Sequence, residues 1–178
     1  MKRIRVPLIV LFFICLANPG EGSPAFPGTF SLDPVFSGLK TPQSVAHFLK
    51  GNFGFVEDAK LFGTLDHWQS PEEFWQRKQG DCEDYALFAA EALRRQGLEV
   101  YVISFYGTEG YAHTIAVFRR GGTFNVIDED RLDEFRAKTL EEALTRVHPG
   151  WTWAAFAERR GPRGWPLARF QNPRHLVL

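Results

Sequence analysis

The sequence predicts an α+β fold in which a buried helix packs against an antiparallel β-sheet. Residues 82–96 are rich in helix formers, and small apolar side chains such as Ala86, Ala90 and Leu93 recur there at helical spacing. Residues 98–128 are dense in Val, Ile, Phe, Tyr and Thr, and glycine-containing turns divide them, which is typical of a β-meander. The 178 residues are enough for one domain with a core of ordinary size.

Residues 1–25 are expected to be a secretory signal peptide. They have a basic start, then an apolar run, and then small residues before the expected cleavage point. The apolar run is too short to span a bilayer, so we expect a periplasmic or secreted protein without a membrane span. Cys15 lies in this segment, which leaves Cys82 as the only thiol of the mature chain. An unpaired thiol in a compartment where disulfides form indicates reactivity.

Residues 26–40 contain Pro and Gly with little periodicity. They are expected to form an extended arm or linker before the main domain, residues 41–178. Thr41-Pro42 has the residue types of a helix N-cap and a first helical position, so a short helix is predicted to about residue 50.

The central helix has a clear start and end in the sequence. Ser70-Pro71-Glu72-Glu73 first predicts a short helix near 71–78. Asp81 then has the residue type of an N-cap for the helix at 82–96, and Gly97 suits its C-terminal end. The remaining predicted elements are strands at 98–105, 111–119, 123–128 and 151–156, and a helix from Thr139 to about residue 147.

Strand parity brings a histidine and a carboxylate to one face of the predicted sheet. A four-residue hairpin loop would set His113 opposite Asp128, whereas a tight Gly121-Gly122 turn would set it opposite Asp130. Either register leaves a carboxylate able to hold the imidazole. Both side chains are expected to point toward the start of the helix that carries Cys82.

Cys82, His113 and Asp128 are therefore the candidate catalytic residues. A thiol in the first turn of a helix lies where backbone N–H dipoles stabilise the thiolate, and a nearby imidazolium would lower its pKa further. A Cys nucleophile, a His base and an orienting Asp suit acyl transfer, which needs no cofactor. The backbone N–H of Cys82 would be one oxyanion donor, and Gln76 is a candidate for the second.

Two carboxylates flank the thiol, and the sequence leaves two explanations open. Asp81 and Glu83 add negative charge, which should raise the pKa of the thiol. Asp81 as N-cap, with Asp84 at the third helical position, would be helix-start chemistry only. Alternatively, Asp81 and Glu83 hold a hard cation such as Ca²⁺, which prefers oxygen ligands.

The charge balance bears on the partners. Lys and Arg number 21, and so do Asp and Glu. This neutral balance argues against a nucleic-acid-binding protein. The expected partner is a protein or peptide substrate, and the oligomeric state stays open.

Three segments together resemble those of bacterial transglutaminase-like cysteine peptidases: Gly80-Asp81-Cys82-Glu83-Asp84-Tyr85-Ala86, Ala112-His113-Thr114 and Asn125-Val126-Ile127-Asp128. The resemblance covers about residues 61–132 and is nearest to the LapG-type periplasmic proteases, which cleave surface adhesins and bind calcium. It implies a transglutaminase-like, papain-like fold with Cys82, His113 and Asp128 in the triad positions. It also implies calcium binding at Asp81 and Glu83. Adhesin cleavage itself is not carried over, because Glu129 stands where Asn is expected in those proteases.

The expected function is that of an exported cysteine peptidase or amidase that works through a thioester. One alternative is transamidation, in which a Lys amine rather than water resolves the thioester. Another is a non-catalytic peptide-binding module with the same fold. Water access to Cys82 separates the first two, and thiol reactivity separates both from the third.

Overall fold

A computed structural model describes residues 31–157 and 169–172 of the chain, so the expected signal peptide lies outside the described residues. Its helices are α1 (Asp33–Gly38), α2 (Pro42–Asn52), α3 (Asp58–Leu61), α4 (Pro71–Arg77), α5 (Cys82–Arg95), the short 3₁₀ turn η1 (Thr108–Gly110) and α6 (Leu140–Val147). Its strands are β1 (Gly54–Phe55), β2 (Gln79–Gly80), β3 (Glu99–Gly107), β4 (Ala112–Arg120), β5 (Thr123–Asp128), β6 (Arg131–Ala137), β7 (Trp151–Phe156) and β8 (Arg169–Gln171).

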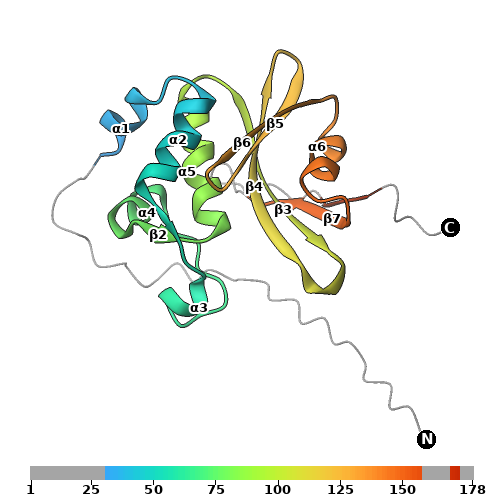
Figure 1. The fold of residues 1–178 in the computed structure, drawn as a ribbon, viewed down its shortest axis with the longest axis horizontal. Helices are drawn as coiled ribbons and strands as arrows, with labels where there is room; N and C mark the ends of the chain where they lie inside the picture. The colour runs from blue at the N-terminus through green and yellow to red at the C-terminus, as the bar shows by residue number, and fades with distance from the viewer. Residues whose placement is uncertain (1–30, 158–168, 173–178) are drawn as a thin grey trace, which may run out of the picture.

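The centre of the fold is a six-stranded antiparallel sheet with the strand order β6-β5-β4-β3-β7-β8. Helix α5 packs on one face of this sheet, with α1, α2 and α4 outside it, and α6 packs on the other face (Figure 1). A separate two-stranded parallel sheet joins β1 to β2 just before α5. The predicted α+β class is therefore confirmed. No helix of the described residues is long and apolar enough to cross a membrane.

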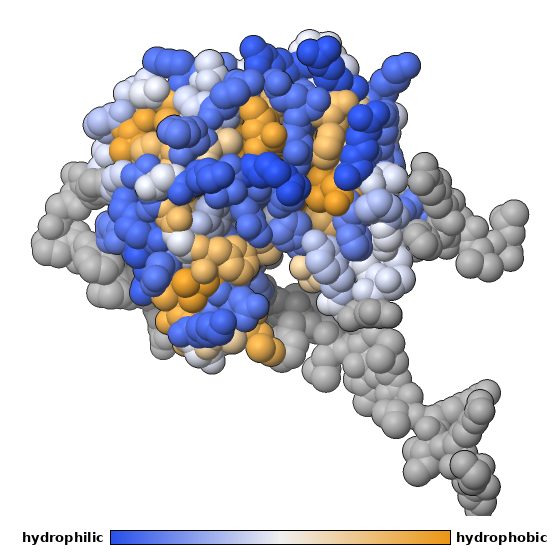
Figure 2. Space-filling model, in the orientation of Figure 1, coloured by the Kyte–Doolittle hydropathy of each residue, from blue (hydrophilic) through white to orange (hydrophobic). Residues whose placement is uncertain are grey.

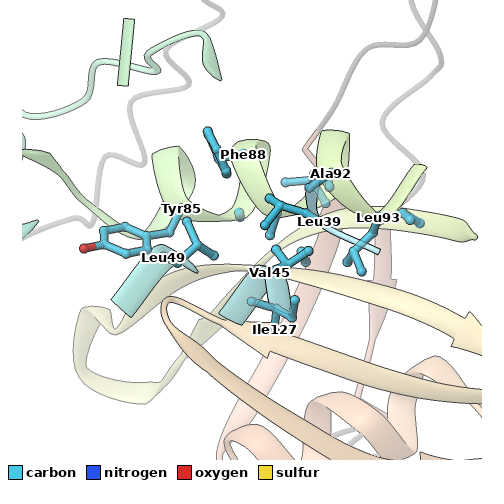
Figure 3. Close-up of a cluster of buried hydrophobic side chains, with 14 of the residues drawn as sticks. Leu39, Val45, Leu49, Tyr85, Phe88, Ala92, Leu93 and Ile127 are labelled. Atoms are coloured by element: carbon cyan, nitrogen blue, oxygen red, sulfur yellow. The ribbon is translucent and has the colours of Figure 1, made fainter. Parts of the chain in front are cut away.

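Helix α5 is buried along most of its length. The small side chains of Ala86, Ala89 and Ala90 are at most 1% exposed, which lets the neighbouring elements approach closely. Side chains from the helices and from β5 meet around it, as Figure 3 shows for Leu39, Val45, Leu49, Tyr85, Phe88, Ala92, Leu93 and Ile127. The predicted central helix and its end at Gly97, where φ is +78°, are thus found in the structure.

Residues 33–38 form helix α1 instead of belonging to the extended arm expected from their Pro and Gly content. The reason is tertiary packing. Phe36 is only 2% exposed, and its ring centroid lies 5.0 Å from that of Phe88 in α5. Pro34 stands in the first turn, where its missing N–H breaks no helical hydrogen bond.

The β4–β5 hairpin adopts the tighter of the two predicted registers. Val117 pairs with Val126 and Arg120 with Thr123, so only Gly121 and Gly122 form the turn. Both glycines have positive φ, 59° and 80°, which other residues rarely adopt. This register places Asp128 at the end of β5, beyond the last β4–β5 pair, Ala116–Ile127.

Candidate active site

A buried carboxylate fixes the start of α5. Asp84 is 1% exposed and accepts three hydrogen bonds, from Gln69 N at 2.8 Å, from Gln69 Nε2 at 2.5 Å and from Asp81 N at 3.2 Å. Gly80 lies directly against this network, because a Cβ there would come within 2.6 Å of Gln69 Nε2 and closer still to Asp84 Oδ2. The Asp84 carboxylate thereby joins the loop before α4 to the first turn of α5, directly beside Gly80 of β2.

The Cys82 thiol lies half-buried at the first position of α5. It donates to Glu83 Oε2 at 3.1 Å, and the backbone N–H of Thr114 acts to lower the pKa of the thiol. Burial first, and then the charge of Glu83, raise the pKa of the thiol well above its ordinary value. This direction agrees with the effect expected of the flanking carboxylates and is opposite to the lowering expected of the helix start and a nearby imidazolium.

His113 and Asp128 are joined by a short hydrogen bond. His113 Nε2 lies 2.6 Å from Asp128 Oδ1, and the two side chains are 13% and 14% exposed. The other oxygen of Asp128 accepts Arg131 Nη2 at 2.8 Å. The observed register, continued past the end of β5, would set Asp130 opposite His113, so the bond to Asp128 is a diagonal contact.

The first residues of β4, which have no pairing partner in β5, are the part of the sheet nearest to the thiol. Helix α5 packs on the sheet face that carries Ala116 and Phe118, whereas His113 alternates with them and shares its face with the core around α6. Thr114 lies beyond the last β4–β5 pair, so its N–H is free of that ladder and acts to lower the pKa of the Cys82 thiol. Cys82 therefore lies near the strand residue next to His113. No bond between the thiol and the imidazole is found among residues 31–157 and 169–172, so the expectation that His113 and Asp128 point toward the start of α5 stays a prediction.

A group of carboxylates adjoins the thiol. Oxygen atoms of Asp58, Asp81 and Asp84 lie within 4.8 Å of one another, and so do those of Asp58, Asp66 and Glu83. Asp58 is 1% exposed, and within the described part of the chain neither its Oδ1 nor the buried Oδ1 of Asp81 has a hydrogen-bond partner. Burial, followed by a hydrogen bond with Asp81, raises the pKa of Glu83 to about 9. Several converging oxygens, two of them without partners, suit a hard cation such as Ca²⁺.

The sequence predictions cover this group only in part. Asp81 and Glu83 were expected to be close to the thiol. Asp58, the first residue of α3, and Asp66, in the loop after it, were not recognised, because isolated carboxylates carry no spacing signal. Gln76 is exposed on α4, and no described contact joins it to Cys82. Its role as an oxyanion donor therefore stays a prediction without support from the contacts.

The chain belongs to the transglutaminase-like domain family, whose model matches residues 37–146. The fold is also similar to that of solved structures. Calcium-bound LapG from Legionella pneumophila has a TM-score of 0.50 and 20% sequence identity, over 71% of this chain and 72% of LapG. The EGTA-treated form of LapG gives the same TM-score and identity, over 71% and 70%.

A candidate cysteine protease from Cytophaga hutchinsonii has a TM-score of 0.45 and 15% identity, over 57% of this chain and 37% of its own. At 20% identity the likeness to LapG shows a shared fold. The comparison with curated proteins finds no match.

Proposed function

We propose that the protein is an exported cysteine peptidase or amidase that hydrolyses peptide or isopeptide bonds through a thioester on Cys82. One observation carries the proposal: His113 and Asp128 form a hydrogen-bonded pair, 2.6 Å apart, and His113 is next in sequence to Thr114, whose N–H acts to lower the pKa of the Cys82 thiol. Membership of the transglutaminase-like family supports the same reading. Acyl transfer by a thiol needs this combination of nucleophile, base and orienting carboxylate.

The hydrogen bond to Asp128 assigns roles to the two imidazole nitrogens. Nε2 of His113 donates to the Asp128 carboxylate, which leaves Nδ1 as the acceptor for the thiol proton. Asp128 would also stabilise the imidazolium that forms, and Arg131 keeps its second oxygen in place. Hydrogen bonds between a nucleophile and its base often shorten only when substrate binds.

The proposed reaction has two acyl-transfer steps. The Cys82 sulfur attacks the carbonyl carbon of the scissile bond, His113 accepts the thiol proton and then gives it to the leaving amine, and the C–N bond breaks. Water then attacks the thioester, with His113 as base, and the C–S bond breaks to release the carboxylate and restore the thiol. The backbone N–H of Cys82 at the start of α5 would donate to the oxyanion of both intermediates.

The carboxylates beside the thiol fit a calcium ion. Asp81 and Glu83, with Asp58 and Asp66 as further ligands, would supply the oxygens. The two buried oxygens without partners, one on Asp58 and one on Asp81, support this assignment. The bound ion would neutralise part of the charge that now opposes ionisation of the thiol.

Residues 1–25 support export of the protein. The basic residues, apolar run and small residues of positions 1–25 support cleavage by a signal peptidase, with release to the periplasm or the medium.

A cleavage assay in heavy-oxygen water tests the proposed function. The purified protein is incubated with a peptide library, with calcium or with chelator, and the products are identified by mass spectrometry. Hydrolysis predicts new carboxyl ends that carry one heavy oxygen, and Cys82→Ala should form none. Products joined to an added lysine analogue would instead indicate transamidation. Equal cleavage by the wild type and Cys82→Ala would refute the proposal.

A further inference from the structure

An exposed aromatic ring lies beside His113, at the turn between β3 and β4. Tyr111 is 42% exposed, yet its ring stacks on that of His148, with centroids 4.3 Å apart and planes 21° apart. Its centroid is 6.1 Å from that of His113. This turn projects at the same end of the molecule as α3 (Figure 1), and a notch separates it from the apolar surface over α3 in Figure 2.

The position of Tyr111 is fixed by contacts behind the ring. Gly107 N donates to Tyr111 O at 2.8 Å, which closes the turn. A Cβ at Gly107 would lie 2.9 Å from His148 Nε2, so only glycine leaves room for the imidazole on which Tyr111 stacks. Phe105, fully buried, contacts both rings from below. A ring held in this way loses little conformational freedom when a ligand binds to it.

Glu129 lies near the same imidazole. An oxygen of Glu129 is within 4.8 Å of a His113 ring nitrogen and of an Asp128 oxygen. Its φ of 51° is in the left-handed region that non-glycine residues rarely adopt, and such strain is concentrated at functional sites. Over residues 31–157 and 169–172, its side chain makes no hydrogen bond or ion pair, while Arg131 binds Asp128 and Asp133 instead.

The electrostatic surroundings of both groups are negative. Burial and then the charge of Asp128 raise the pKa of Glu129, so its carboxylate gains from a positive partner. The pKa of Tyr111 is raised by burial first and then by the charges of Asp128, Cys82 and Glu129. An anionic ligand would be repelled here.

We propose that Tyr111 and Glu129 form a subsite for a cationic side chain of the substrate, lysine or arginine, next to the bond that Cys82 attacks. The inference rests on the proposed function and names its substrate class. An aromatic face attracts a cation, which is worth about two- to fivefold in affinity at an exposed site. A substrate without the cation would leave Glu129 unpaired, and this gives discrimination. His148 and Gly107 are positioning residues for the ring.

Matched peptides test the subsite. Each pair differs only in lysine against norleucine, which keeps the aliphatic stem and removes the charge, on either side of the scissile bond. We expect kcat/KM of the full-length wild type to favour lysine at one of the two positions by about fivefold. Tyr111→Leu and Glu129→Gln should each reduce this ratio toward one, whereas Tyr111→Phe, which keeps the ring, should retain it. Glu134→Gln is the control, because Glu134 is an exposed carboxylate of β6 paired with Arg120.

The outcomes separate the inference from the proposed function. A wild type that cleaves no peptide contradicts the proposed function and the inference that rests on it. Cleavage without a lysine preference at either position contradicts the inference alone. If Glu129→Gln slows lysine and norleucine peptides equally and shifts the pH profile, Glu129 acts on His113 and not on substrate, and the subsite is refuted.

Discussion

Substitution of Gly80 by alanine should disrupt the network that fixes the start of α5. A Cβ at this position would overlap Asp84 Oδ2 and lie 2.6 Å from Gln69 Nε2. Both atoms belong to buried side chains with 1% and 0% exposure, so neither can move into solvent. The methyl group must therefore displace the carboxylate from at least one of its hydrogen bonds.

The expected cost follows from the contacts that are lost. A hydrogen bond to a charged group contributes about 1.5–3 kcal/mol, and a buried donor left without a partner adds to that cost. We expect Gly80→Ala to lower the free energy of unfolding by about 3 kcal/mol, which corresponds to a fall in Tm of roughly 6–12 °C for a domain of this size. The thiol of Cys82 should also become more accessible to alkylation.

Gly51 provides the matched control. It lies on the exposed surface of α2, and a Cβ there would meet nothing within 4 Å. Gly51→Ala should be neutral or stabilise the protein by about 0.5 kcal/mol, because alanine is the better helix former. Urea unfolding monitored by circular dichroism measures both variants. A free energy of unfolding for Gly80→Ala within about 0.5 kcal/mol of the wild type would show that the Asp84 network does not hold this junction.

Three further predictions concern the site. The pKa of the Cys82 thiol is raised, so the rate of its alkylation by iodoacetamide in chelator should reach half of its maximum at a pH well above the ordinary thiol pKa of roughly 8.5. Calcium should lower this midpoint. A midpoint at or below the ordinary pKa in chelator contradicts the account. Calcium should raise Tm of the wild type by mass action on the folded state, and Glu83→Gln should weaken this rise. Glu91→Gln on the same helix loses only a surface ion pair and should show the same rise in Tm as the wild type. Asp128→Asn should lower kcat at least about a hundredfold, while Asp133→Asn, which shares Arg131 but not the imidazole, should leave kcat near that of the wild type.

Local signals predicted the parts of the fold that depend on local chemistry. Helix α5 was recognised from Asp81 and Gly97 because caps are set by side chains within a few residues. The correct hairpin register was one of two predicted alternatives. It was predicted from Gly121-Gly122, because a two-residue turn needs positive φ at both positions and glycine adopts it readily.

Other parts depend on contacts between distant segments and could not be predicted. Helix α1 is stabilised by Phe36 on Phe88, and no local signal outweighs its proline and glycine. Strand β6 was missed because it is a charged edge strand with a register shift, in which Asn125 Oδ1 accepts Arg136 N and Arg136 has a φ of 50°.

The same distinction holds for the candidate site. Parity and capping placed the thiol at the helix start and joined His113 to Asp128, as the hydrogen bond between them shows. The sequence recognised that the adjacent Glu83 raises the pKa of the thiol, but it could not show that burial, the largest cause, makes the net shift upward, because burial is a tertiary property. Asp58 reaches the carboxylates beside the thiol because β1 pairs with β2 and the following helix, α3, packs against β2.

Acylation of Cys82 tests the central claim most directly. The protein is incubated with calcium and an activated acyl-amide probe, and intact-mass and peptide spectra measure the rate and position of the adduct. The account predicts a single adduct of the acyl group, without its amine, on Cys82, formed at least about a hundredfold more slowly in His113→Ala. An adduct at another residue, or the same rate on Cys82 in the wild type and in His113→Ala, would contradict it.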